Sequence, residues 1–173
     1  MRPGQAGYTL VELIVVVVLI GLMFGLAVPA VRDTLLNDSL KQAARRLTGA
    51  TAELRADAMR EHADTLLRIS LDENRFWIET ADMTEEKRAE LRQKESHALP
   101  EDVRIADIQR IGEKKQTEGE AEIRFSKQGY AQPAAIHLVK DDRYVTLMIE
   151  PFLSKIRTYD RYVDLDEKKA PQG

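Results

Sequence analysis

A long apolar run near the amino terminus constrains this chain more than any other feature. Residues 10–31 make up 22 positions with a single charged side chain, Glu12. About 20 helical residues span the hydrocarbon core of a bilayer, so the run is long enough for one crossing. Charged residues are 32% of the chain and crowd into the part that begins at Arg32. The sequence therefore predicts a membrane helix joined to a soluble domain.

Two simpler interpretations of the run leave its acidic residue unexplained. One is an uncut membrane anchor, with a chain that begins at Met1. The other is a secreted or periplasmic protein whose signal peptide is removed after Ala30, where small residues occupy the usual positions. A carboxylate within a membrane helix costs about 2.5 kcal/mol or more, so it usually reaches the interface, is protonated or faces a specific partner. Glu12 therefore indicates a partner inside the membrane.

A cut after Gly7 would supply that partner. The cut would create a new α-amino group on Tyr8, four residues before Glu12 in the same apolar stripe. The amine of one chain and the carboxylate of a staggered neighbour can neutralise each other in the low-dielectric core of a helical bundle. We therefore predict that Glu12 sets the axial register when copies assemble.

The segment Gly7–Leu13, which reads Gly-Tyr-Thr-Leu-Val-Glu-Leu, resembles the class III signal of type IV prepilins and pseudopilins. The resemblance implies a leader peptide at residues 1–7 and cleavage between Gly7 and Tyr8 by a cytoplasmic prepilin peptidase and methyltransferase. It further implies N-methylation of Tyr8 and a transmembrane assembly helix at residues 8–31. Tyrosine at this position replaces the commoner phenylalanine with another aromatic residue.

A weak stretch of helix is predicted within the run, at Gly25 and Pro29. Proline inside a helix removes an amide donor and collides with the carbonyl four residues earlier, which belongs here to Gly25. Prepilins often carry proline at this place, and the resemblance implies that the helix can unwind there in filaments. Gly21 and Gly25 also fit a close-packing motif between membrane helices.

Basic residues near the ends of the run favour the orientation opposite to the one that the leader requires. Arg2 precedes the run. The basic residues that follow it most closely are Arg32, Lys41, Arg45 and Arg46. Such residues normally stay in the cytoplasm, but a cytoplasmic peptidase must reach Gly7. We therefore expect a single-pass protein of the bacterial inner membrane with its globular domain in the periplasm.

Helical periodicity continues beyond the run and then gives way to strand patterns. Apolar residues recur every three or four positions over residues 32–62, which predicts an amphipathic continuation of one helix from about Thr9 to about His62. Residues 63–165 form the predicted β-rich domain and residues 166–173 a flexible tail. The expected strands cover residues 65–71, 75–80, 102–111, 121–125, 134–139, 144–149 and 155–159, with a charged surface insertion and short helix within 82–98. The fold class is therefore α+β, a long helix packed on an antiparallel sheet.

The order of these elements resembles the H-type minor pseudopilins of type II secretion systems and the related FimT/FimU-like minor pilins. Phe125–Gly129 followed by an apolar strand, and Tyr144–Pro151 near the end, are similar to the closing hairpin of that family. The resemblance implies a structural subunit that joins other pseudopilins in a filament and supports protein export across the outer membrane. It implies no enzymatic activity and no small-molecule substrate.

A second interpretation rests on the basic segment near the carboxy terminus. Basic residues interleaved with tyrosines can hold phosphates and stack bases. Some FimT-like minor pilins bind DNA through such a segment, which would assign DNA contacts to Lys155, Arg157 and Arg161. Four acidic residues between positions 160 and 167 would repel phosphate, and the net charge of −3 argues against bulk nucleic-acid binding. We therefore expect nucleic acid not to be a partner.

The sequence predicts no catalytic residue, no metal site and no cofactor. It contains no cysteine, which excludes thiolate nucleophiles and cysteine-ligated metals. His62, His97 and His137 lie on different predicted elements without metal-ligand spacing, so we expect each to be solvated or packed. No phosphate-binding glycine loop or nucleophile elbow occurs.

Overall fold

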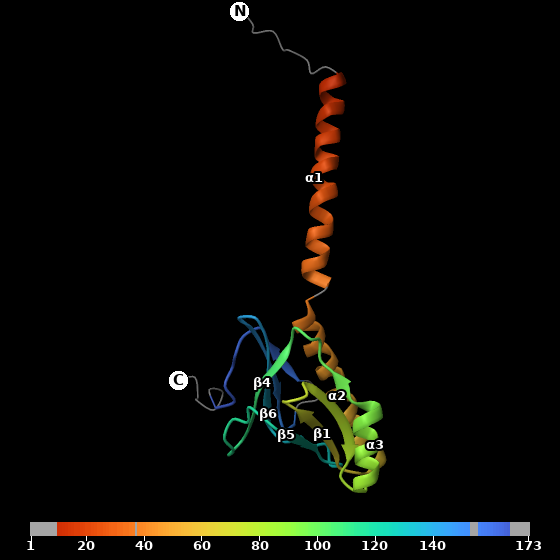
Figure 1. The fold of residues 1–173 in the computed structure, drawn as a ribbon, viewed down its shortest axis with the longest axis vertical. Coiled ribbons are helices and arrows are strands. Elements are labelled where there is room, and N and C mark those ends of the chain that lie inside the picture. Colours follow the sequence, from red (N-terminus) through yellow and green to blue (C-terminus); the bar gives the residue numbers. More distant parts are fainter. Residues whose placement is uncertain (1–9, 37, 153–155, 167–173) are drawn as a thin grey trace, which may run out of the picture. The chain divides into compact units, whose positions relative to one another are not determined.

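The chain divides into two compact units, residues 1–38 and residues 39–173. The computed structural model describes residues 10–36, 38–152 and 156–166, and the side chains of all of these except 24–36. The first unit contains helix α1 (Leu10–Leu36), and the second begins with helix α2 (Ser39–Glu61). Strands and a further helix, α3 (Glu85–Glu95), complete the second unit (Figure 1).

The predicted helical segment is present, but it is divided where a single helix was expected. Helical structure ends at Leu36 and begins again at Ser39, and Asp38 belongs to neither helix. The sequence at this point is Asn-Asp-Ser. Such side chains compete with the backbone for hydrogen bonds, so they favour helix starts over helix interiors. The apolar spacing did not indicate this break, because apolar residues recur at the same helical spacing before and after it.

The strands form two four-stranded antiparallel sheets, which corrects the expectation of one sheet. Their bounds are β1 (Thr65–Ser70), β2 (Arg75–Thr80), β3 (His97–Ala98), β4 (Arg104–Arg110), β5 (Glu120–Phe125), β6 (Ala134–Lys140), β7 (Arg143–Ile149) and β8 (Arg157–Tyr159). One sheet has the order β3-β2-β1-β5 and the other β4-β6-β7-β8. The seven predicted strands correspond to β1, β2 and β4 to β8, whereas β3 was not predicted. Alternation shows which side chains face the core, but it does not reveal which strands become neighbours.

One hydrophobic core joins α2 to both sheets. Leu40, Leu47 and Leu54 recur every seven residues on one side of α2, and each is at most 2% exposed. They belong to the same buried cluster as Leu67 of β1 and Leu147 of β7. Burying one such side chain contributes about 2 kcal/mol to folding. The amphipathic pattern predicted for this helix is confirmed.

Helix α3 is held on the outer face of the first sheet by charged groups. None of its residues is buried. Arg92 forms ion pairs with Glu73 at 2.7 Å and with Glu120 at 2.6 Å. Its guanidinium lies 5.2 Å from the ring centroid of Trp77, which is 3% exposed. The prediction of a surface insertion with a short helix is therefore confirmed.

Candidate assembly helix and carboxy-terminal surface

Helix α1 exposes apolar side chains on every side of its described part. Of residues 10–23, all but Glu12 and Gly21 are apolar. Their exposed fractions run from 45% at Val16 to 76% at Leu10. A helix that is apolar all round is normally buried in a large protein or in a membrane. The described part of α1 therefore presents an apolar surface that its own unit does not cover.

The predicted processing and register residues lie at the start of this helix. Glu12 is exposed and occupies the first turn of α1, where a carboxylate interacts favourably with the helix dipole. Gly7 and Tyr8, the predicted sites of cleavage and methylation, lie outside the described residues. The roles of all three residues stay predictions.

The middle of the apolar run stays helical. Helix α1 continues through Gly25 and Pro29, and the predicted weakness at these positions stays a prediction. Where side chains are described, the structure contains no helix that is both long and apolar enough to cross a bilayer. The transmembrane role of residues 8–31 is likewise a prediction.

The basic segment proposed for DNA contact carries charges of both signs. Lys155 lies outside the described residues. Arg157 is exposed, with its Nε 3.5 Å from the Glu150 carboxylate. Arg161 is also exposed, and the exposed Asp160 directly precedes it. Adjacent carboxylates oppose phosphate, so this surface lacks the uniform positive charge typical of nucleic-acid sites.

Sequence reasoning missed a buried polar cluster on the second sheet. His137 of β6 is fully buried, and its Nδ1 lies 2.8 Å from the carboxylate of Asp107 on β4. Its Nε2 lies 3.0 Å from the carbonyl oxygen of Val163. The ring of Tyr162 stacks on the imidazole at a centroid distance of 3.9 Å, and its hydroxyl donates to Asp107. Each nitrogen of the buried imidazole thus has an oxygen within hydrogen-bonding distance, and His137 is packed, as expected.

A second set of contacts fixes the same carboxy-terminal segment. Gln109 donates to the Asp164 carboxylate and accepts from the amide of Leu165. The hydrogen bond from Gln109 holds the pKa of Asp164 below its usual value. Burial raises the pKa of Tyr162, and the hydrogen bond with Tyr162 raises the pKa of Lys115. These contacts fasten residues 162–165 to the sheet.

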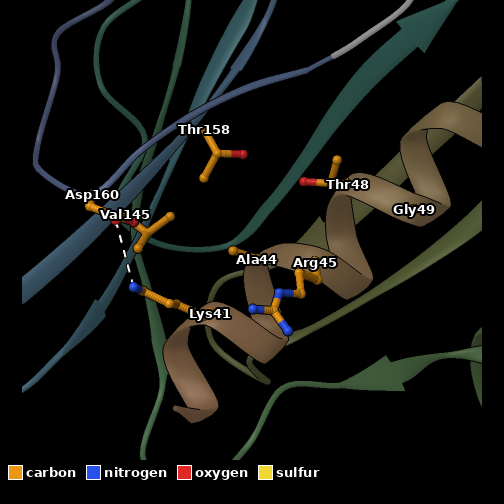
Figure 2. Close-up of a pocket in the computed structure, with 8 residues that line it drawn as sticks. All are labelled: Lys41, Ala44, Arg45, Thr48, Gly49, Val145, Thr158 and Asp160. Carbon is orange, nitrogen blue, oxygen red and sulfur yellow. Dashed lines mark ion pairs between the residues drawn. The ribbon is translucent and has the colours of Figure 1, made fainter. Parts of the chain in front are cut away.

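A groove runs between α2 and the β8 edge of the second sheet (Figure 2). Its volume is about 500 Å³. It is lined by Lys41, Ala44, Arg45, Thr48 and Gly49 of α2 and by Val145, Thr158 and Asp160. The ion pair between Lys41 and Asp160, at 3.7 Å, connects the two walls. No local pattern indicated this groove, because its walls lie more than 90 residues apart in the chain.

Comparison with known proteins identifies both the amino-terminal motif and the fold. Residues 2–28 match the family model of the prokaryotic N-terminal methylation motif. No curated protein matches the chain. A solved structure of the minor pseudopilin EpsH from the type II secretion system of Vibrio cholerae aligns with 71% of this chain and 98% of its own, at 14% identity and a TM-score of 0.51. A second EpsH structure aligns with 75% of this chain and 99% of its own, at 16% identity and a TM-score of 0.53. The predicted motif and the pilin-like α+β fold are therefore confirmed.

Proposed function

We propose that this chain is a minor pseudopilin, a structural subunit that assembles into the pseudopilus of a type II secretion system and supports protein export across the outer membrane. The main support for this proposal is that two independent features occur in the same chain. A methylation motif at residues 2–28 precedes a domain with the fold of a minor pseudopilin. A subunit of this kind acts by assembly, so it requires no catalytic residue and no cofactor.

Before assembly, the proposed subunit waits in the inner membrane. Residues 8–31 span the bilayer and the globular unit faces the periplasm. The prepilin peptidase removes residues 1–7 by cutting between Gly7 and Tyr8, and the new amino terminus is methylated. The exposed apolar side chains of α1 support this arrangement, because water would be an unfavourable environment for them.

During assembly, the α1 helices of neighbouring subunits cover one another. This contact buries apolar surface that contributes about 25 cal/mol for each Å² removed from water, although lipid already supplies part of that gain to the anchored subunit. Glu12 then pairs with the amino group of Tyr8 in an adjacent subunit. The pair offsets the loss of hydration of both charges, so it favours one axial register over others. Gly25 and Pro29 give the helix a place to extend within the filament.

The intact mass of protein extracted from membranes tests the processing step. We expect a chain that lacks residues 1–7 and carries one added methyl group on Tyr8. An uncut anchor would retain Met1, and a signal peptidase product would begin at Val31. Either of these masses would contradict the proposal.

Substitution of Glu12 tests the assembly step. We expect Glu12→Leu to enter the membrane normally and to lose co-assembly with other pseudopilins, because the amine of the neighbour has no counter-charge. Glu53→Leu, which replaces an exposed glutamate of α2, is the matched control and should assemble. If pseudopili incorporated both variants equally well, the proposed pairing of Glu12 with the amine of a neighbour would be wrong. Crosslinking of membrane fractions measures the incorporation.

The DNA-binding interpretation makes a separate prediction. If these residues bound DNA, the full chain would retard duplex DNA in a gel at low salt, and the double variant Arg157→Ala and Arg161→Ala would not. We expect no shift, because Asp160 and Glu150 lie beside these arginines. A salt-sensitive shift that depends on both arginines would instead support a role in DNA uptake.

A further inference from the structure

We infer that the groove between α2 and β8 receives an extended, acidic segment of a partner protein, which adds a strand to the edge of β8. This inference goes beyond the proposed assembly role. That role uses α1, whereas the groove lies entirely within residues 39–173 (Figure 2). The three lines of support are the strand edge, the shape of the groove and the charge of its walls.

The strand edge offers unpaired backbone groups. β8 is the last strand of its sheet, and it pairs with β7 through the registers Thr146 to Tyr159 and Met148 to Arg157. In the described part of the chain, no backbone hydrogen bond reaches the other edge of β8. An exposed edge of this kind is a template for an additional strand from another chain. The second sheet can therefore extend by one strand beside the groove.

The groove provides room for the side chains of such a strand. Successive side chains of a strand point to opposite faces, so every second one would enter the groove. The lining residues Ala44 and Val145 are small and apolar. No heavy atom lies within 4 Å of the position that a Cβ would occupy on Gly49. A space of about 500 Å³ accommodates several small aliphatic side chains.

The charge of the walls selects an acidic occupant. Lys41 and Arg45 line the α2 wall, and Asp160 is the acidic residue among the eight that line the groove. Among the described residues, Arg45 forms no ion pair, whereas Lys41 pairs with Asp160 at 3.7 Å. The side chains of that pair are 48% and 70% exposed, so the pair is weak and a docking carboxylate can replace it. The chain's own tail, 167–173, carries two lysines and one glutamate and is therefore a poor match.

Hydrogen exchange with two designed peptides tests the inference on the full chain in zwitterionic detergent micelles. One probe is a capped hexapeptide of alternating valine and glutamate, and the other alternates valine and lysine. We expect the acidic probe to slow amide exchange at residues 157–159 and the basic probe to leave it unchanged. Exchange in α1 serves as the control for binding to the micelle. Equal protection by both probes, or protection by neither, would overturn the inference.

Four variants locate the binding to this groove. Arg45→Glu should weaken binding of the acidic probe by about tenfold. Arg104→Glu, which lies on β4 at the opposite edge of the same sheet, is the matched control and should bind normally. Asp160→Asn should strengthen binding, because it removes the competing carboxylate.

Gly49→Leu should abolish binding by filling the groove. A Cβ at this position meets no heavy atom within 4 Å and leucine is a good helix former, so the variant should fold, and thermal unfolding checks that it does. Undiminished binding to Gly49→Leu or to Arg45→Glu would place the probe elsewhere and refute the groove as its site.

Discussion

The two helices that begin this chain use the same residue type in opposite ways. Leu19 of α1 is 55% exposed, whereas Leu47 of α2 is 1% exposed. Helix α1 is apolar on all its described sides, while α2 carries its leucines on one buried face. Apolar content alone therefore does not build a core. The leucines of α2 stabilise the domain in which they lie, and those of α1 become stabilising only when something else covers them.

Truncating one leucine in each helix gives the largest expected contrast. Leu47→Ala should lower the free energy of unfolding of the globular unit by about 3–5 kcal/mol, because it leaves a cavity in the core. Leu19→Ala should change it by less than about 0.5 kcal/mol. Urea unfolding of the full chain in micelles, followed by fluorescence of its single tryptophan, Trp77, measures both. Equal losses would show that α1 is part of the same cooperative core.

Removing the buried imidazole should have the next largest effect. His137→Ala should cost about 2–4 kcal/mol, because it creates a cavity, leaves the Val163 carbonyl without its partner and leaves Asp107 with Tyr162 alone. His97→Ala replaces an exposed histidine of β3 and should cost less than about 1 kcal/mol. The same unfolding assay compares them. A small loss at His137 would mean that residues 162–165 are fixed by other contacts.

The carboxy-terminal contacts predict a decline of stability at alkaline pH. The pKa of Tyr162 is raised by burial, and that of Lys115 by its hydrogen bond with Tyr162. A raised pKa means that the folded state favours the protonated group, so this stabilisation is present below the usual tyrosine value of 10.0 and is lost as the pH rises through the folded value. The midpoint temperature of thermal unfolding should therefore decrease as the pH is raised above about 10.

Two tyrosine variants isolate this effect. Tyr162→Phe should show a shallower alkaline decline than the unsubstituted chain, because phenylalanine has no group to ionise. Tyr130→Phe, at a half-exposed position away from the cluster, should show the original decline. Identical profiles for the two variants would assign the alkaline effect to other groups.

Matched glycines give the smallest contrast. Gly49→Ala should stabilise the globular unit by about 0.5–1 kcal/mol, because alanine restricts the unfolded chain and its Cβ meets nothing within 4 Å. Gly21→Ala in α1 should leave the unfolding of that unit unchanged. Thermal scans monitored through Trp77 resolve a shift of this size. A loss of stability at Gly49 would indicate a steric conflict on the groove side of α2.

Local patterns were sufficient for most elements of the fold, but not for the break between α1 and α2 or for the short strand β3. The hairpin of β1 and β2 followed from two alternating runs around a polar turn, where Asn74 adopts a positive φ of 52°. The burial of α2 followed from its apolar spacing, and the exposure of α3 from its lack of apolar residues. The pairing of strands did not follow, because β1 and β5 meet across about 50 residues and nothing in either strand specifies the other.

The candidate sites show the same distinction between local motifs and long-range pairing. Gly7, Tyr8 and Glu12 were predicted because their whole signal is contained in one short motif. The His137 cluster was missed, although Asp107 and Gln109 are polar residues at alternate positions of a β-strand. Such a pattern suggests a solvated face unless the partner strand is known, and β6 supplies that partner 30 residues later. Long-range topology, rather than residue type, converted these side chains into a buried network.

The manner in which α3 is attached has a practical consequence for anyone who wishes to see this molecule at work. None of its residues 85–95 is itself buried, and exposed ion pairs such as those of Arg92 are individually worth little. The connection between β2 and β3 is therefore a natural insertion point for an epitope or a small fluorescent domain. A label inserted before α3 would lie on the outside of the subunit and would leave the contact of Arg92 with Trp77 in place.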